Sequence, residues 1–227
     1  MDGPSEQSFK GATEDAFISS VYFFASTEKL AQAAGILGCE EDHQKYLSLS
    51  EKIRAAVLHE YFAPSGRLCI NTQAAYVIAL KFGVYRNKEA LINGLKLRLK
   101  ADGCRIRCGF VGAPLLCEVL AENGMADLAL HIFLQEKFPS WLHCVNLGAT
   151  TIWERWNSVL DDGSISGTGM NSLNHYAYGS VVNYAVRYLA GFQPLEPGCR
   201  KICIAPQFDG RLGYMYCSYC SASGKYR

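Results

Sequence analysis

Apolar residues recur every three or four positions from Thr13 to Pro139, the spacing expected of amphipathic helices. A first run begins after Thr13 and ends near Leu37, where glycines follow. A second run ends at Tyr61, and the turn-forming segment 63–66 closes it. The pattern therefore opens with two consecutive helices joined by a short loop.

Four further helices are expected before Pro139. Thr72 and Asn87 carry short polar side chains that cap helix N-termini, and Pro114 suits a first helical turn. Gly83 and Gly124 follow the third and fifth runs, as glycine does at helix ends. The expected spans are 72–82, 87–103, 114–123 and 127–138.

The segment 140–173 breaks this pattern. It lacks sustained helical periodicity, contains several glycines, and holds all three tryptophans of the chain. A loop of this length inside a compact domain is usually functional or disordered, and its aromatic content argues against disorder. A seventh helix is then expected from Asn174 to Gly191.

Beyond Pro194 the period changes to two. Apolar residues at Ile202 and Ile204, and again from Leu212 to Tyr216, flank the turn-forming segment 208–211, which predicts a β-hairpin. A second, all-β domain is expected to begin near residue 198. About thirty residues are too few to bury a sheet independently.

Composition narrows the classes of partner. With 227 residues, of which 49% are hydrophobic, the chain can bury a substantial globular core. A formal net charge of +1 with scattered Lys and Arg supplies neither a basic stripe for nucleic acid nor a polybasic membrane face. We therefore expect no nucleic-acid partner and no membrane partner.

The cysteines predict a reducing compartment. Ten cysteines in a chain of this size fall short of a disulfide scaffold. Cys217 and Cys220 form a single C-x-x-C without a second ligand pair, so two thiols on a strand edge are expected, with no metal and no cofactor. The polar segment 1–12 is unlike a signal peptide, which predicts a cytoplasmic protein if Met1 is the natural start.

The main chemical candidate lies in the segment 150–156, where Trp153, Glu154 and Trp156 stand close together, with His175 further along. A carboxylate can activate water, indole rings pack on the apolar face of a pyranose, and an imidazole hydrogen-bonds hydroxyls. On these residues alone, a structural ion pair between Glu154 and Arg155 beside packed aromatics is the more common arrangement.

Several ordered blocks carry a family resemblance. They are TQAAY (72–76), GFVGAP (109–114), LAENG (120–124), PSW (139–141), GATTIWERW (148–156), DGS (162–164), SLNHYAYGS (172–180) and PLEPG (194–198). With them, nearly the whole chain resembles the bacterial α-L-rhamnosidases of glycoside hydrolase family 78, enzymes that remove terminal L-rhamnose.

The resemblance implies a mainly α fold. Residues 1–197 would form part of a six-hairpin (α/α)6 toroid, and residues 198–227 the first strands of a C-terminal β-sandwich. It also implies inverting hydrolysis of a rhamnose-containing glycoside or oligosaccharide. Glu154 matches the general base of the family and His175 its substrate-binding histidine, and Trp153 and Trp156 are expected to contact the sugar.

Two departures from the family pattern stand out. The motif that carries the general acid of the family is absent between Met1 and Arg227, so the chain reads as a fragment that lacks activity alone and self-associates through uncovered apolar faces. Arg105 and Arg107 stand where relatives carry a threonine-rich stretch. Either these arginines contact an acidic or extended aglycone, or they are solvated surface residues; the sequence leaves both alternatives open.

Two alternatives remain open from the sequence. Other α/α-toroid glycosidases, acting on fucosides, glucosides or trehalose, share hairpins and a carboxylate carried by a loop. A non-enzymatic helical module that binds carbohydrate or protein is the third reading, since helical arrays often serve as scaffolds.

Overall fold

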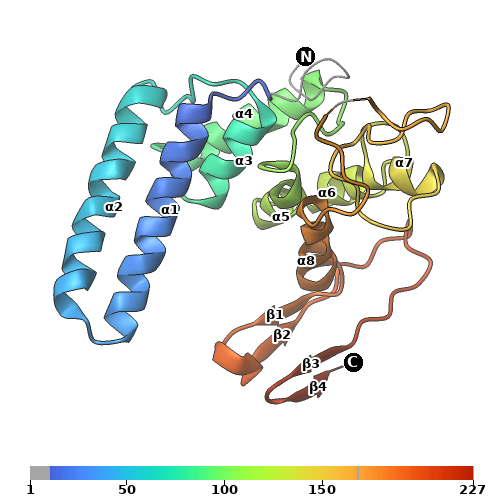
Figure 1. Ribbon diagram of the computed structural model, residues 1–227. Coiled ribbons are helices and arrows are strands. Elements are labelled where there is room, and N and C mark those ends of the chain that lie inside the picture. Colours follow the sequence, from blue (N-terminus) through green and yellow to red (C-terminus); the bar gives the residue numbers. More distant parts are fainter. Residues whose placement is uncertain (1–10, 168, 227) are drawn as a thin grey trace.

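The computed structural model describes residues 11–167 and 169–226, and its first half consists of three helical hairpins (Figure 1). Each hairpin consists of two helices that are consecutive in the chain and contact one another: α1 with α2, α3 with α4, and α5 with α6. Their bounds are α1 Asp15–Ile36, α2 Glu40–Tyr61, α3 Gln73–Lys81, α4 Lys88–Ala101, α5 Ala113–Glu122 and α6 Ala126–Phe133.

Alternate helices form an inner layer. α1 contacts α3, α3 contacts α5, and α5 contacts the helical segment near residue 180, while α2, α4 and α6 pair with their hairpin partners. Residues 73–80 of α3 are all buried, as expected for a helix that is apolar nearly all round. By contrast, α2 buries only Ser50 and Val57, so it covers the outside of this layer.

Capping explains where two of the helices begin. The side chain of Thr72 accepts a hydrogen bond from the Ala75 backbone N–H, and that of Asn87 accepts one from the Ala90 N–H. Both caps were predicted from the sequence and are confirmed. The sixth helix ends at Phe133, earlier than the predicted end at Phe138.

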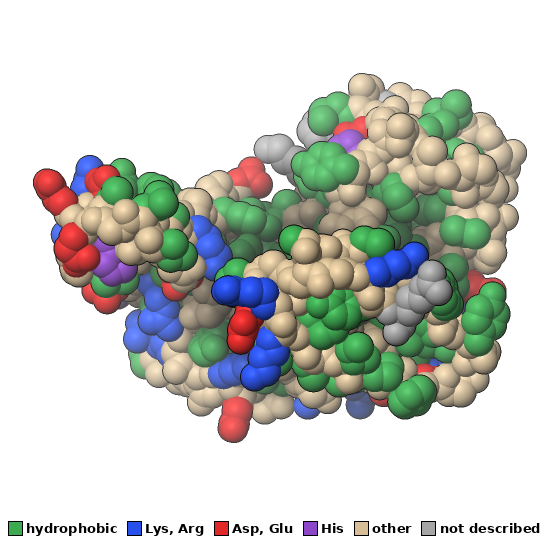
Figure 2. All heavy atoms as spheres, turned by 90° about the horizontal axis from the view of Figure 1, so that it is seen from below, with side chains coloured by type: hydrophobic (Ala, Val, Ile, Leu, Met, Phe, Trp, Pro, Cys, Tyr) green, Lys and Arg blue, Asp and Glu red, His purple; other side chains and the backbone are tan. Residues whose placement is uncertain are grey.

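The long segment after α6 contains one short helix that the sequence pattern did not predict, α7 (Trp141–Asn146). Ser140 caps it, since its hydroxyl accepts a hydrogen bond from the His143 N–H. The rest of this segment, up to Tyr176, contains turns and bends and one isolated bridge between Val159 and Ile165. In Figure 2 charged side chains of both signs lie mainly in the left half and the lower centre, and few lie at the upper right.

The last helical stretch is irregular. It starts at Ala177, three residues after the predicted start, as the 3-10 helix η1 (Ala177–Val181), continues as α8 (Val182–Tyr184), and ends as the π-helical turn η2 (Ala185–Leu189). Gly191 follows with φ +69°, and a β-carbon there would lie 2.0 Å from a backbone atom of Ala205. Only glycine fits this helix end.

The strands pair differently from the predicted hairpin. β1 (Phe192–Pro194) pairs antiparallel with β2 (Ile202–Ile204), with Phe192 opposite Ile204, and β3 (Tyr219–Ser221) pairs with β4 (Gly224–Tyr226). The 3-10 turn η3 (Pro197–Cys199) connects β1 and β2. Residues 212–216, expected to pair with β2, form no strand. The domain boundary at residue 198 stays a prediction, and β1 begins before it.

Candidate active site

Two backbone segments from opposite ends of the long loop bring the predicted site residues together. The Glu154 N–H donates to the Ser172 carbonyl at 2.9 Å, and the His175 N–H donates to the Ile152 carbonyl at 2.7 Å. The two segments run antiparallel across these bonds. Glu154 and His175, which are 21 positions apart in the sequence, therefore lie on neighbouring segments.

The Glu154 carboxylate is half-buried and held by the backbone. Its Oε2 accepts a hydrogen bond of 2.8 Å from the Ser172 N–H. Its Oε1 has no hydrogen-bond partner among the described residues, so it is free to accept a proton from a bound molecule. A carboxylate oriented in this way is suited to act as a general base.

Glu154 lines a cavity of about 290 Å³. The other walls come from the start of α1, from Ala74 in α3, from the segment 108–111, and from Tyr178. Asp15, in the first turn of α1, is a second carboxylate on the wall and is exposed. The site is therefore assembled from parts of the chain far apart in sequence.

Gln73 positions one wall of this cavity. The side chain is fully buried, and its amide nitrogen donates to Asp102 Oδ2 at 2.7 Å and to the Arg105 carbonyl at 2.8 Å. Its amide oxygen accepts from the Arg107 N–H at 2.9 Å. These bonds hold the backbone just ahead of Cys108. In the sequence Gln73 stands out only as part of the TQAAY block, and the signal for its role is an amide in an otherwise apolar helix.

A hydrogen bond between two threonines places the start of α1. The hydroxyls of Thr13 and Thr72 are 2.6 Å apart and buried, and Thr72 is also the cap of α3. This bond keeps the first turn of α1, with Asp15, beside the inner helix that supplies Ala74. Both helices therefore present their N-terminal ends to the cavity.

His175 is half-buried beside this cavity. Its Nδ1 accepts a hydrogen bond of 3.3 Å from the Ala177 N–H, so the neutral ring carries its proton on Nε2. That N–H is a donor for a ligand hydroxyl. The ring lies between those of Phe110, at 5.9 Å between centroids, and Tyr176, at 4.9 Å.

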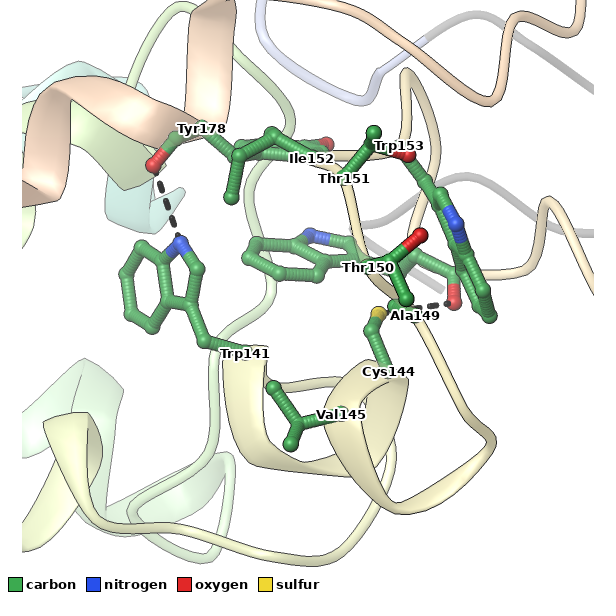
Figure 3. A pocket seen from close by; sticks show the side chains of 10 residues that line it. Trp141, Cys144, Val145, Ala149, Thr150, Thr151, Ile152, Trp153 and Tyr178 are labelled. Atoms are coloured by element: carbon green, nitrogen blue, oxygen red, sulfur yellow. Dashed lines mark hydrogen bonds between the residues drawn. The ribbon is translucent and has the colours of Figure 1, made fainter.

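Trp153 and Trp156 face a different cavity, of about 280 Å³, which Figure 3 shows. Only 2% of Trp156 is exposed: its ring stacks on Tyr178 at 3.9 Å, and its indole N–H donates to the Cys108 carbonyl at 3.2 Å. Neither tryptophan lines the cavity that holds Glu154. Their predicted contact with sugar stays a prediction, and the structure gives them a packing role.

Trp141 completes this aromatic wall. Its ring meets that of Trp156 edge-on at 5.2 Å, and its indole N–H donates to the Tyr178 carbonyl at 3.0 Å, the bond drawn in Figure 3. Tyr178 lines both cavities. Its ring therefore stands between the tryptophan cluster and the carboxylate.

The thiols of these walls are poor nucleophiles. Burial raises the pKa of Cys108, in the first cavity, to about 12, and that of Cys144, in the second, to about 11. Both remain protonated near neutral pH. Burial also raises the pKa of Tyr178, so its hydroxyl is neutral there. Acid–base chemistry in the first cavity thus falls to the carboxylates.

Within 11–167 and 169–226, no cluster of three or more His, Cys, Asp or Glu side chains could hold a metal ion. None of the helices in these ranges is both long and apolar enough to cross a membrane. Arg105 and Arg107 are partly buried, and neither lines the cavity of Glu154.

The sequence is similar to those of known proteins. The chain is 36% identical over 219 residues to an alpha-L-rhamnosidase of Alteromonas sp. (strain LOR), covering 95% of this chain and 24% of that protein. An alpha-L-rhamnosidase of Formosa agariphila is also 36% identical, over 207 residues, with 89% and 22% covered. The chain thus spans about a quarter of the length of these curated relatives.

Solved structures agree with the fold. The crystal structure of Streptomyces avermitilis alpha-L-rhamnosidase complexed with L-rhamnose superposes with a TM-score of 0.85 at 34% identity, covering 94% of this chain and 21% of that one. The alpha-L-rhamnosidase of Aspergillus terreus gives 0.87 at 28% identity, covering 94% and 25%. The predicted mainly α, six-hairpin fold is confirmed.

A family model, described as the bacterial alpha-L-rhamnosidase 6 hairpin glycosidase domain, matches residues 2–189. The match includes all six long helices as well as Glu154 and His175. It ends where the last helical stretch ends, at Leu189. The chain therefore belongs to the bacterial alpha-L-rhamnosidase six-hairpin glycosidase family.

Proposed function

We propose that the protein hydrolyses terminal α-L-rhamnosides and that Glu154 is the general base. The observation that carries this proposal is the Glu154 carboxylate, held at 2.8 Å by the Ser172 N–H on the wall of a cavity, with His175 on the neighbouring segment. The names of the relatives supply the sugar, and the structure of one of them was solved as a complex with L-rhamnose.

The proposed reaction inverts the anomeric configuration. Glu154 takes a proton from water, and the water oxygen forms a bond to the anomeric carbon as the bond to the glycosidic oxygen breaks. A carboxylic acid on the opposite side of the sugar gives its proton to that leaving oxygen. The base typically contributes about 10²–10⁴-fold to such a rate.

His175 binds the sugar in this scheme. Its Nε2–H points a donor at a hydroxyl of the substrate or at the attacking water, while the Ala177 N–H keeps the ring in one tautomer. A donor that acts before and during the reaction affects both KM and kcat. His175 is therefore the second residue on which the proposal depends.

The general acid lies outside residues 1–227 in this proposal. Among the described residues, Asp15 is the carboxylate besides Glu154 that lines the cavity. It is exposed in the first turn of α1, where its negative charge interacts favourably with the helix dipole. We therefore expect residues 1–227 alone to release no rhamnose.

A panel of 4-nitrophenyl glycosides tests the proposal with the full-length protein to which this chain belongs. We expect the α-L-rhamnoside to be hydrolysed far faster than the fucoside and glucosides, and NMR to show the β-anomer of rhamnose as the first product. Faster cleavage of another glycoside would favour a different toroid glycosidase. Binding of rhamnose without any hydrolysis would favour the non-enzymatic module.

A further inference from the structure

Three rings contact one another in the order Phe110, His175, Tyr176, and the first of them lines the Glu154 cavity. The ring of Tyr176 stacks on that of His175, with 4.9 Å between centroids and 24° between planes. The centroid of the Phe110 ring lies 5.9 Å from that of His175. We name these three residues the aromatic strip. Phe110 is also part of the cavity wall, so it connects the aromatic strip to the cavity.

The outer members of the strip are open to solvent. Tyr176 is 86% exposed and Phe110 is 51% exposed. Single exposed aromatics are common on protein surfaces and need no explanation. Tyr214, for example, is 91% exposed and makes no ring contact with another described residue. The strip differs because its rings are ordered by mutual packing and adjoin a cavity with a carboxylate.

The size of the cavity limits what it holds. Its volume of about 290 Å³ lies at the lower end of the range of roughly 300–1,000 Å³ for small-molecule sites. One sugar ring fills such a space. In the proposed site, the group bonded to that sugar lies at the mouth, where Phe110 passes from the cavity wall to the surface.

We propose that the aromatic strip is an outer subsite that stacks on the flat apolar face of a second substrate ring, either a sugar or an aryl group. This inference rests on the proposed glycosidase function. An aromatic side chain attracts such a face through dispersion and apolar burial, which requires no charge and tolerates different rings.

The test compares three α-L-rhamnosides in the full-length protein: 4-nitrophenyl rhamnoside, a rhamnosyl-glucose disaccharide, and methyl rhamnoside, which has no second ring. The readout is the kcat/KM of each ring-bearing substrate divided by that of methyl rhamnoside. We expect Tyr176→Ala to lower this ratio roughly threefold to tenfold, the size of one aromatic contact. Tyr176→Phe keeps the ring and should keep the ratio.

Tyr214→Ala is the matched control, because it removes an equally exposed tyrosine far from the proposed site in sequence and should leave the ratio unchanged. Phe110→Leu gives a second test, since it keeps an apolar side chain but removes the ring. A loss confined to the aryl substrate assigns the subsite to an aryl group, and a loss confined to the disaccharide assigns it to a sugar.

An unchanged ratio in both Tyr176→Ala and Phe110→Leu would overturn the subsite. So would an equal loss on methyl rhamnoside, because that substrate cannot reach the strip. These outcomes are separate from failure of the proposed function. If the wild-type protein cleaves no rhamnoside, or Glu154→Gln keeps full activity, the proposed function itself is wrong.

Discussion

The two cavities on either side of Tyr178 differ in what they offer a ligand. Glu154 and Arg155 line one of them, together with Asp15, whereas Trp153 and Trp156 line the other. Neighbouring residues of the segment 153–156 therefore line different cavities. The difference teaches that tryptophans around a carboxylate in the sequence need not share one surface with it, because they can support the backbone that carries the carboxylate.

The strongest test of this comparison is Glu154→Gln. An amide cannot take a proton from water, so we expect kcat to fall about 10²–10⁴-fold while substrate binding and stability change little. Steady-state kinetics and thermal melting of the full-length protein measure both. If the variant keeps more than half of the wild-type kcat at saturating substrate, the base lies elsewhere.

Trp156→Ala examines the other cavity. The ring is 2% exposed and stacks on Tyr178, so its removal should lower the free energy of unfolding by about 3–5 kcal/mol. Urea denaturation measures the loss. A large rise in KM without a loss of stability would instead show that Trp156 contacts the sugar, as the sequence predicts.

Trp141→Phe removes one hydrogen bond from the same cluster. Without the indole N–H, the Tyr178 carbonyl lacks its partner, and we expect a destabilisation of about 1–3 kcal/mol. Denaturation curves compared with those of Trp141→Ala separate this bond from the packing of the ring. Wild-type stability in the phenylalanine variant would contradict a structural role for the bond.

His175→Ala should have the smallest effect of the four on free energy. Loss of one neutral donor costs on the order of tenfold in kcat/KM, divided between KM and kcat. His175→Gln retains a side-chain donor and serves as the control. A variant that melts many degrees lower but keeps normal kinetics would assign His175 to the start of η1 rather than to the substrate.

The helical hairpins could be predicted because their signals are local. Thr72 and Asn87 cap their helices as expected, and the apolar spacing marks the buried faces. The short helix α7 was missed because it is only six residues long, too short for a period to emerge. Ser140 directly after Pro139 was the available signal, as its hydroxyl caps this helix.

The strands were harder to predict for a physical reason. Alternation in residues 212–216 resembles a strand, yet Tyr214 is 91% exposed and the segment pairs with no other described residues. β2 pairs instead with β1, at the end of the last helical stretch. Pairing depends on which segments the rest of the fold brings together, and alternation does not encode that choice.

The location of the candidate site could be predicted only in part, and the roles of its residues stay predictions. Glu154 and His175 are brought together by backbone bonds between segments 152–154 and 172–175, which no local pattern reveals. The family resemblance supplied that pairing. Gln73, Phe110 and Tyr176 were not singled out, since their importance comes from contacts between distant parts of the chain.

The close approach at Gly191 has a consequence for how this family varies. Because any β-carbon there would collide with the backbone at Ala205, no other amino acid can replace this glycine while the chain keeps its path. We expect relatives to preserve glycine at this position even where both neighbouring segments have diverged. The absence of a side chain at Gly191 thus allows the chain after the last helical stretch to pass directly against the backbone at Ala205.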